Sequence, residues 1–470
     1  MRSFLKGLFK VLLIVLLCAV TFVGGLVLGS YSSKTALDRK FTTLQAVHGI
    51  LLNDFYFGQN TDEYSQQLVD DAIYGMVKAQ GDIHTEYMSA NELAKFTGSL
   101  ESSFVGIGVT YTVVDDQILV VSVIRSSPAE ASGVLAGDII IAVDGESVES
   151  IGIDNIADRI KGKVGTEVVV TVLRGIETID IPIIRNTISN TVFSEVVDGI
   201  GVITLTSFSD GTGKEFKNHL DYLKENNVTR LIIDLRDNGG GYASTLNTIS
   251  SYFLEKGDIV MREYDREGNE ILDTATGGNK YYYDKIILLA NGNTASSSEV
   301  FILAMKEYCN AIIVGEKTYG KGVAQVTKML MDGSAIKYTD LIWKSSKGVY
   351  IGGTGIVPDY EVKLHDILYM NYLTIDEGVF YHYDTVSDKV AQMQLMLDFL
   401  GYGVDRVDGY FSQKTKEALI SFQKDKGLEV NGVLDEVSSS ALNSEVVRSW
   451  QLETEKYDTQ MNFALNLIKQ

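Results

Sequence analysis

The chain has 470 residues, 45% of them hydrophobic and 22% charged, which is enough for about two to four domains with cores of their own and excludes a disordered protein. Its formal net charge is -21, because 62 acidic residues outnumber 41 Lys and Arg residues. No basic block offsets this excess, so the composition argues against nucleic-acid binding by phosphate neutralisation.

The amino terminus carries a candidate membrane anchor. An uncharged run of 19 residues at 11–29 is just long enough to span a bilayer as a helix. Arg2, Lys6 and Lys10 precede this run, which predicts that residues 1–10 lie in the cytoplasm. Because the small-residue cleavage site of a signal peptide is poorly matched, we expect the anchor to be retained.

Five further segments follow the predicted anchor. Apolar residues in 35–95 recur every three or four positions, which predicts helices. In 96–184, strand-like runs alternate with Gly-containing turns around one short helix, which predicts a compact domain of mixed α and β structure. In 190–384, apolar runs such as GIGVITL and RLIIDL alternate with helical segments, an order that favours an α/β domain with largely parallel strands. The segment 385–445 has the pattern of helices and short loops, and 446–470 is a tail of unclear role.

The stretch VGEKTYGKGVAQ at 314–325 contains most of a phosphate-binding loop. Such a loop needs a lysine, then Ser or Thr, then a helix whose amino terminus faces the phosphates. Gly322 stands where the hydroxyl residue belongs, and the β-branched run VAQVTKML leads to a hairpin turn at Asp332 and Gly333. Lys321 is therefore predicted to stand at the start of a strand, and nucleotide binding is kept only as an alternative.

A serine lies on a predicted strand-to-helix turn in LLANGNTASSSEVFILAMKEY. The spacing of Ser296 and Glu299 is that of a capping box, so Ser296 could serve only as a helix cap. The same geometry exposes a hydroxyl, and the backbone near Ser297 offers donors to a developing oxyanion. The glycine run 239–241 of DLRDNGGGY could bring further donors, or be a flexible turn.

A nucleophilic serine also needs a base. None of the five histidines lies in a loop that is expected to face the turn: His48, His84, His219, His365 and His382. Lys321 lies 25 residues after Ser296 and is the alternative. It accepts a proton near neutral pH only if burial lowers its pKa by about three units, or about 4 kcal/mol. Gly320 and Gly322 fit close packing around this lysine, and they equally fit a plain turn with a solvated lysine.

Taken together, these motifs resemble those of the carboxyl-terminal processing peptidases, serine proteases with a Ser/Lys pair and an inserted PDZ domain. In TASSSE, the resemblance implies Ser296 as the nucleophile. In GEKTYGKGVAQ, it implies Lys321 as the general base and Gln325 as the residue that orients it. The similarity of IIDLRDNGGG to the oxyanion segment implies Gly240 as an oxyanion donor, together with the backbone of Ser297.

The resemblance extends to a peptide-binding loop and to the carboxyl-terminal segment. SSFVGIGVTY is similar to a PDZ carboxylate-binding loop, which implies that a substrate's free carboxyl terminus binds the backbone of Val105, Gly106, Ile107 and Gly108. A glycine-rich hairpin edge is the alternative. GDIHTEYMSANE is similar to a structural motif, so His84 is expected to be structural. Paired DGYF and NGVL turns in 389–443 resemble a peptidoglycan-binding domain, with a helical spacer as the alternative.

The sequence therefore predicts a multidomain α/β protein with an N-terminal membrane helix, a helical segment, a PDZ domain inserted before an α/β protease core, and a small helical C-terminal domain. The resemblance implies a serine endopeptidase at the cell membrane, with its catalytic domain extracytoplasmic and an acyl-enzyme on Ser296. The expected partners are proteins or peptides with free C-termini, cell-wall peptidoglycan and further copies of the chain. No metal or organic cofactor is expected. The alternative function is an inactive PDZ and wall-binding scaffold.

Overall fold

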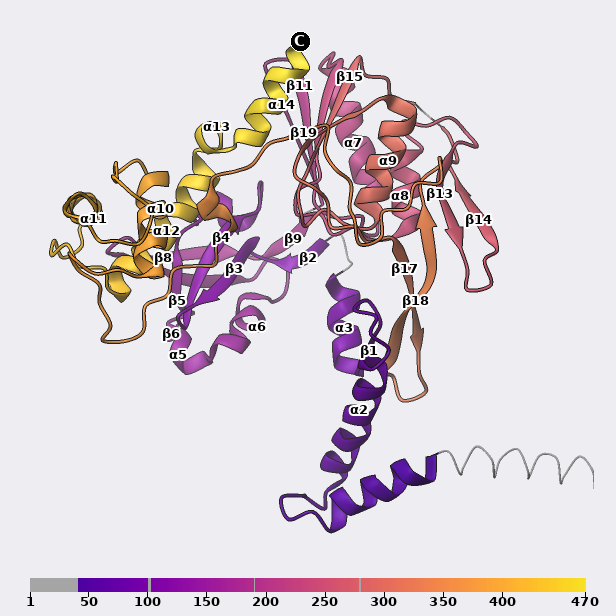
Figure 1. The fold of residues 1–470 in the computed structure, drawn as a ribbon, viewed down its shortest axis with the longest axis horizontal. Helices are drawn as coiled ribbons and strands as arrows, with labels where there is room; N and C mark the ends of the chain where they lie inside the picture. The colour runs from indigo at the N-terminus through magenta and orange to yellow at the C-terminus, as the bar shows by residue number, and fades with distance from the viewer. Residues whose placement is uncertain (1–40, 100–102, 190, 279) are drawn as a thin grey trace, which may run out of the picture. The chain divides into compact units, whose positions relative to one another are not determined.

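The computed structural model describes residues 41–99, 103–189, 191–278 and 280–470 (Figure 1). These residues belong to two compact units: 41–94 with Gln325–Thr339, and Lys95–Ala324 with Asp340–Gln470. The anchor predicted at 11–29 lies outside the described residues. None of the helices in the described ranges combines the length and the apolar character that a bilayer crossing requires.

The smaller unit consists of helices and an antiparallel hairpin. Residues 41–53 and α2 (Asp62–Lys78) are helical, as the three- and four-residue spacing of their apolar residues predicts. The helix α3 (Ala90–Ser99) spans the boundary between the two units along the chain. The strands of the hairpin and its antiparallel neighbour are β17 (Val323–Met329), β18 (Ala335–Lys344) and β1 (Glu86–Met88).

Residues 103–189 of the larger unit form a small domain around an antiparallel sheet. Its elements are β2 (Ser103–Gly106), β3 (Val109–Val114), β4 (Gln117–Val123), α4 (Pro128–Ser132), β5 (Ile139–Val143), β6 (Glu146–Ser147), α5 (Val148–Ile151), η1 (Ile153–Asn155), α6 (Ile156–Ile160), β7 (Glu167–Arg174), β8 (Glu177–Ile184) and β9 (Asn186–Ser189). The strand order is β3-β4-β5-β7-β8, with β6 beside β5, and β2 pairs separately with β9. The strand β3 is therefore an edge strand of this sheet.

The next domain is built on a six-stranded sheet. Its elements are β10 (Val192–Val197), β11 (Ile200–Leu205), α7 (Thr212–Glu225), β12 (Arg230–Asp234), α8 (Ala243–Ser250), β13 (Ile259–Tyr264), β14 (Glu270–Thr274), β15 (Lys285–Ala290), α9 (Ser297–Cys309), β16 (Ile312–Gly315) and β19 (Tyr360–Glu361). The order of the large sheet is β10-β11-β12-β15-β16-β19, in which all pairs except β10 with β11 are parallel. The strands β13 and β14 pair with each other, and β13 also pairs with β18. The prediction of largely parallel strands is confirmed.

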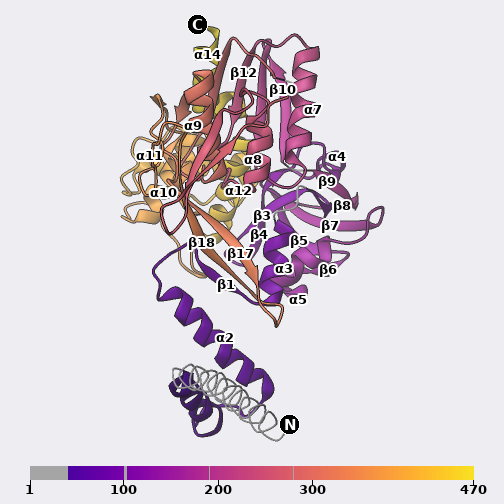
Figure 2. The same ribbon diagram turned by 90° about the vertical axis from the view of Figure 1, so that its right-hand side faces the viewer.

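Helices cover both faces of the large sheet (Figures 1 and 2). Along β12, Leu231 and Ile233 pack into the cluster that contains residues of α7, α8 and α9. Ile232 packs instead with residues of α14 (Thr459–Lys469), because successive side chains of a strand point to opposite faces. The segment that the sequence left without a role therefore forms the second helical layer of this domain.

In the carboxyl-terminal domain, the same hydrogen bond from a turn glycine to a buried glutamine occurs twice. Its helices are η2 (Asp366–Tyr369), α10 (Asp388–Phe399), α11 (Gln413–Asp425), α12 (Glu436–Leu452) and α13 (Thr454–Tyr457). The buried Gln394 accepts the Gly409 N–H at 3.0 Å, and Gln423 accepts the Gly432 N–H at 2.9 Å. Each glutamine thus holds the turn that precedes the next helix. These turns are the DGYF and NGVL motifs of the sequence.

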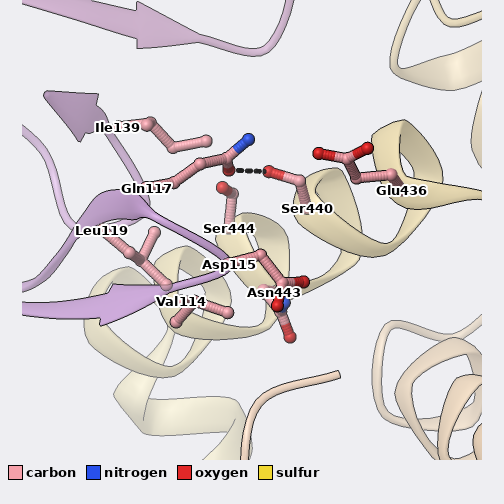
Figure 3. Close-up of a pocket in the computed structure, with 9 residues that line it drawn as sticks. All are labelled: Val114, Asp115, Gln117, Leu119, Ile139, Glu436, Ser440, Asn443 and Ser444. Atoms are coloured by element: carbon pink, nitrogen blue, oxygen red, sulfur yellow. Dashed lines mark hydrogen bonds between the residues drawn. The ribbon is translucent and has the colours of Figure 1, made fainter. Parts of the chain in front are cut away.

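The helix α12 also contacts the small antiparallel domain. Ser440 donates its hydroxyl to Gln117 Oε1 at 2.6 Å, across a pocket of about 10 Å³ (Figure 3). A space of this size holds about one water molecule at most. Arg448 donates to the Gly137 carbonyl at 3.1 Å, and its guanidinium lies 3.6 Å from the fully buried Asp138. The pocket in Figure 3 therefore lies at the interface between α12 and the small antiparallel domain, and it is too small to hold a peptide.

Candidate functional site

Ser296 occupies a strained turn between a buried strand and a helix. The strand β15 ends at Ala290, and α9 begins at Ser297. Ser296 has φ 59° and ψ −122°, a conformation that non-glycine residues seldom adopt. Such strain is found where a turn presents a nucleophile at the end of a strand. The side chain of Ser296 is half-buried, whereas those of its neighbours Ser297 and Ser298 are buried.

The predicted oxyanion segment packs directly against this turn. Gly240 has φ +99°, and a Cβ atom there would lie 2.9 Å from the Ala295 carbonyl oxygen and from the Ser297 nitrogen. Only glycine fits so close an approach. Asn238, which is fully buried, holds the two segments together, because its carbonyl accepts the Ala295 N–H and the Ser298 hydroxyl, each at 3.0 Å.

The two predicted oxyanion donors differ in their hydrogen bonds. The Gly240 N–H donates to Asn238 Oδ1 at 2.9 Å, so this donor is engaged within its own loop. Ser297 is the first residue of α9, and the N–H of such a residue has no acceptor within its helix. Its hydroxyl donates to the Gly241 carbonyl at 2.9 Å. The Ser297 N–H is therefore available in this geometry, and the Gly240 peptide must turn before its N–H can serve an oxyanion.

Glu299 is the residue that joins the serine turn to the lysine loop. Its side chain is fully buried, and its carboxylate accepts four hydrogen bonds. Oε1 accepts the Thr318 hydroxyl at 2.5 Å and the Gly320 N–H at 2.7 Å. Oε2 accepts the N–H groups of Ser296 and Lys321, each at 2.9 Å. From the sequence, the place of Glu299 in the first turn of α9 predicted only its capping bond to Ser296. Its other hydrogen-bond partners lie about 20 residues downstream, where no local motif indicates them.

The shared acceptor brings the backbone of Ser296 and Lys321 together. Two nitrogens that donate to one oxygen at 2.9 Å lie within about 6 Å of each other. Lys321 is half-buried, and its carbonyl accepts the Trp343 indole N–H at 3.0 Å. The strand β17 follows it, as predicted, where a phosphate-binding loop would have a helix. This contradicts the nucleotide alternative.

Gln325 and His84 both belong to the smaller unit. Gln325 lies on β17, and its amide donates to the Thr339 hydroxyl at 3.4 Å. His84 lies in a turn around Asp82, whose carboxylate accepts the His84 N–H at 3.0 Å and the Thr85 hydroxyl at 2.6 Å. Burial favours the protonated form of Asp82, but the hydrogen bonds from Thr339, Thr85 and His84 outweigh it and lower its pKa. These contacts agree with a structural role for the His84 turn.

The predicted carboxylate-binding loop begins in a strand. Val105 and Gly106 are the last residues of β2, where they pair with β9. Ile107 and Gly108 lie between β2 and the edge strand β3. The Ile107 carbonyl accepts the Ala129 N–H at 2.8 Å, and the Gly108 carbonyl accepts the Ile124 N–H at 2.9 Å. The loop is thus fixed at one end of a strand with an open edge.

Three family models match successive parts of the chain. They are the PDZ domain at residues 105–184, peptidase family S41 at 199–362 and the peptidoglycan binding domain at 386–442. The carboxy-terminal processing protease CtpA of Bacillus subtilis is 34% identical over 476 residues, covering 99% of this chain and 99% of that protein. A "Probable CtpA-like serine protease" of Staphylococcus epidermidis is 33% identical over 462 residues, covering 97% of this chain and 92% of its own length.

The chain belongs to the CtpA-like carboxy-terminal processing proteases. It is a serine protease, as the sequence motifs predict. Among solved structures, the photosystem II D1 C-terminal processing protease is similar, with 25% identity and a TM-score of 0.42, over 63% of this chain and 82% of that one. The multidomain architecture with a PDZ domain, a protease core and a helical carboxyl-terminal domain is confirmed. Within the described ranges, no group of three or more His, Cys, Asp or Glu side chains could hold a metal ion.

Proposed function

We propose that this protease is a membrane-anchored, extracytoplasmic endopeptidase that captures protein C-termini on its PDZ domain and cleaves through an acyl-enzyme on Ser296. The observation that supports it best is the Glu299 carboxylate, which accepts the backbone N–H groups of both Ser296 and Lys321. This contact brings together the backbone of two residues that lie 25 positions apart in the sequence. Proteolysis of an unfolded protein by the chain and by its Ser296→Ala variant tests the proposal.

In the proposed mechanism, Lys321 acts as base and then as acid. Its neutral amine takes the Ser296 proton while the hydroxyl oxygen attacks the scissile carbonyl, and it returns the proton to the leaving amine. The N–H groups of Ser297 and Gly240 stabilise the oxyanion, the Gly240 peptide having turned away from Asn238. Lys321 then deprotonates a water that attacks the ester, and it returns this proton to the Ser296 oxygen as the acid product leaves.

The PDZ domain would bind substrate as an added strand. The edge of β3 offers unpaired backbone groups to an extended peptide, and the loop from Val105 to Gly108 lies where the peptide's carboxylate would end. An inactive Ser296→Ala chain is expected to bind a peptide with a free C-terminus at least about tenfold more tightly than the same peptide amidated. Fluorescence anisotropy measures both affinities. Equal affinities would contradict carboxylate capture.

The two ends of the chain would fix its location. Residues 11–29 would anchor it in the cell membrane with residues 1–10 in the cytoplasm, and the carboxyl-terminal domain would bind peptidoglycan. We expect the full chain to sediment with membranes, whereas a chain lacking residues 1–30 sediments only with purified cell-wall sacculi. Soluble peptidoglycan fragments should release it. A truncated chain that stays in the supernatant with sacculi present would refute wall binding.

The smaller unit supports a homo-oligomer. In the helix at 41–53, the apolar residues Leu44, Val47 and Ile50 follow one another at three-residue spacing and are about half exposed (50%, 48% and 55%). A stripe of this kind suits a helix of a second copy. The mass of the detergent-solubilised chain in light scattering tests this assembly.

A further inference from the structure

Arg236 connects the carboxyl-terminal helix α14 to the predicted oxyanion segment. This arginine lies in DLRDNGGGY, two residues before Asn238. Its side chain is 12% exposed, and its guanidinium forms ion pairs with two carboxylates whose side chains are 10% and 7% exposed. One belongs to Asp234, with contacts at 2.9 and 2.6 Å. The other belongs to Asp458, which is 222 residues away and accepts two hydrogen bonds at 2.9 and 2.8 Å.

The helix that carries Asp458 is firmly docked on the protease core. Ala464 and Ile468 of α14 are fully buried against the strands of the large sheet. Gln460 accepts from Arg236 at 3.1 Å and donates to the Val362 carbonyl at 2.8 Å. Asp458 is therefore held in place by packing and hydrogen bonds on both sides.

Arg236 directly precedes the segment that faces Ser296, so its position affects the position of that segment. The segment from Asp237 to Gly240 leaves the sheet directly after Arg236, and Asp237 is tied on its far side to Asn291 and Asn293. The position of Asn238 sets the direction of two N–H groups. Its side-chain Oδ1 accepts the Gly240 N–H, and its backbone carbonyl accepts the Ala295 N–H. A shift of Arg236 would thus be passed to the donors of the oxyanion.

We propose that Asp458 is a positioning residue for proteolysis, which sets the oxyanion segment through Arg236. This inference rests on the proposed role of Ser296 and Gly240. Two anions around one buried guanidinium fix its plane through bidentate hydrogen bonds. With Asp458 removed, Arg236 keeps one carboxylate and a wider choice of positions, so the segment that carries Gly240 loses the fixed position from which its peptide turns toward the oxyanion.

Asp458 has a second role that the experiment must separate. It is the N-cap of α14, because its Oδ1 accepts the Met461 N–H at 2.9 Å. Serine is as good a helix cap as aspartate, but it offers no charge and no second oxygen to Arg236. Asp458→Ser therefore keeps the cap and loses the ion pair. Asp458→Asn keeps the cap and one acceptor oxygen. The matched control is Lys469→Ala, which removes the exposed ion pair with Asp198 at the other end of the same helix.

The test compares full-length variants in steady-state cleavage of a peptide substrate, in thermal unfolding and in labelling of the serine by a fluorophosphonate. We expect Asp458→Ser to lower kcat and the labelling rate about tenfold, with KM within about twofold. Because an enclosed guanidinium loses one of its two carboxylates, Tm should also fall by a few degrees, with the chain still folded at the assay temperature. Asp458→Asn should recover part of kcat, and Lys469→Ala should match the unmodified chain. An Asp458→Ser variant with unchanged kcat, or one whose activity falls only in proportion to its folded fraction, overturns the inference.

The same experiment separates this inference from the proposed function. Ser296→Ala is included as the inactive reference. If Ser296→Ala still cleaves, the proposed nucleophile is wrong, whatever Asp458→Ser does. If Ser296→Ala is inactive while Asp458→Ser is fully active, only the role of Asp458 is wrong.

Discussion

Ser296→Ala and Lys321→Ala are each expected to abolish proteolysis without unfolding the chain. Removing a nucleophile or its base costs roughly a thousandfold or more in kcat, and residues that act as a unit lose no more when both are changed. The two single variants and the double variant should therefore show the same residual activity on an unfolded protein substrate. Circular dichroism and Tm check that the fold is retained.

Lys321→Arg is the matched control for charge. Arginine keeps the positive charge but stays protonated at any workable pH, so it cannot accept the serine proton. We expect it to be as inactive as Lys321→Ala. Activity in Lys321→Arg would mean that the site needs a cation and not a base. Undiminished cleavage by either alanine variant would remove the Ser/Lys proposal.

Glu299→Gln is expected to lower both activity and stability. This carboxylate is the acceptor in all four of its hydrogen bonds. The donors are the N–H groups of Ser296, Gly320 and Lys321 and the hydroxyl of Thr318. A glutamine amide offers one accepting oxygen, so its NH₂ group would face two donors. A buried donor left unpaired costs about 1–3 kcal/mol. Relief of this conflict would separate the two loops, so kcat should fall by roughly a hundredfold.

Glu307→Gln provides a control on the same helix. Glu307 accepts the Ser345 hydroxyl at 2.6 Å near the other end of α9 and is only half-buried. We expect it to change Tm by a few degrees at most and to leave kcat unchanged. If both glutamine variants lost Tm alone and kept kcat, Glu299 would be a structural acid without a part in holding the serine and lysine together.

Local chemistry made several features readable from the sequence. The strand-to-helix turn at Ser296 follows from a β-branched run, small residues and an apolar helix. The strand after Lys321 follows from its β-branched residues and the Asp332-Gly333 turn. The parallel sheet follows from the alternation of strands and helices. The family follows from the order of these motifs, which the full-length relatives confirm.

The sequence also predicted correctly that Ser296 and Glu299 cap the helix α9. The capping bond from the Ser296 N–H to Glu299 is present, so the helix-cap interpretation and the nucleophile proposal use the same residue pair. The capping motif predicts that bond because its partners are three residues apart. It cannot predict that the other carboxylate lone pairs serve Thr318 and Gly320.

By itself, then, the sequence determined most of the elements up to residue 445, their order and the residues with suitable chemistry, because propensity, periodicity and capping act within about one turn or one strand. Only the tertiary structure decided which of them meet. The Glu299 contact to the lysine loop spans 22 residues, and the contact of Asp458 with Arg236 spans 222. Such contacts arise from the packing of α9 and α14 on opposite faces of one sheet, and no local period in the chain encodes that choice of partner.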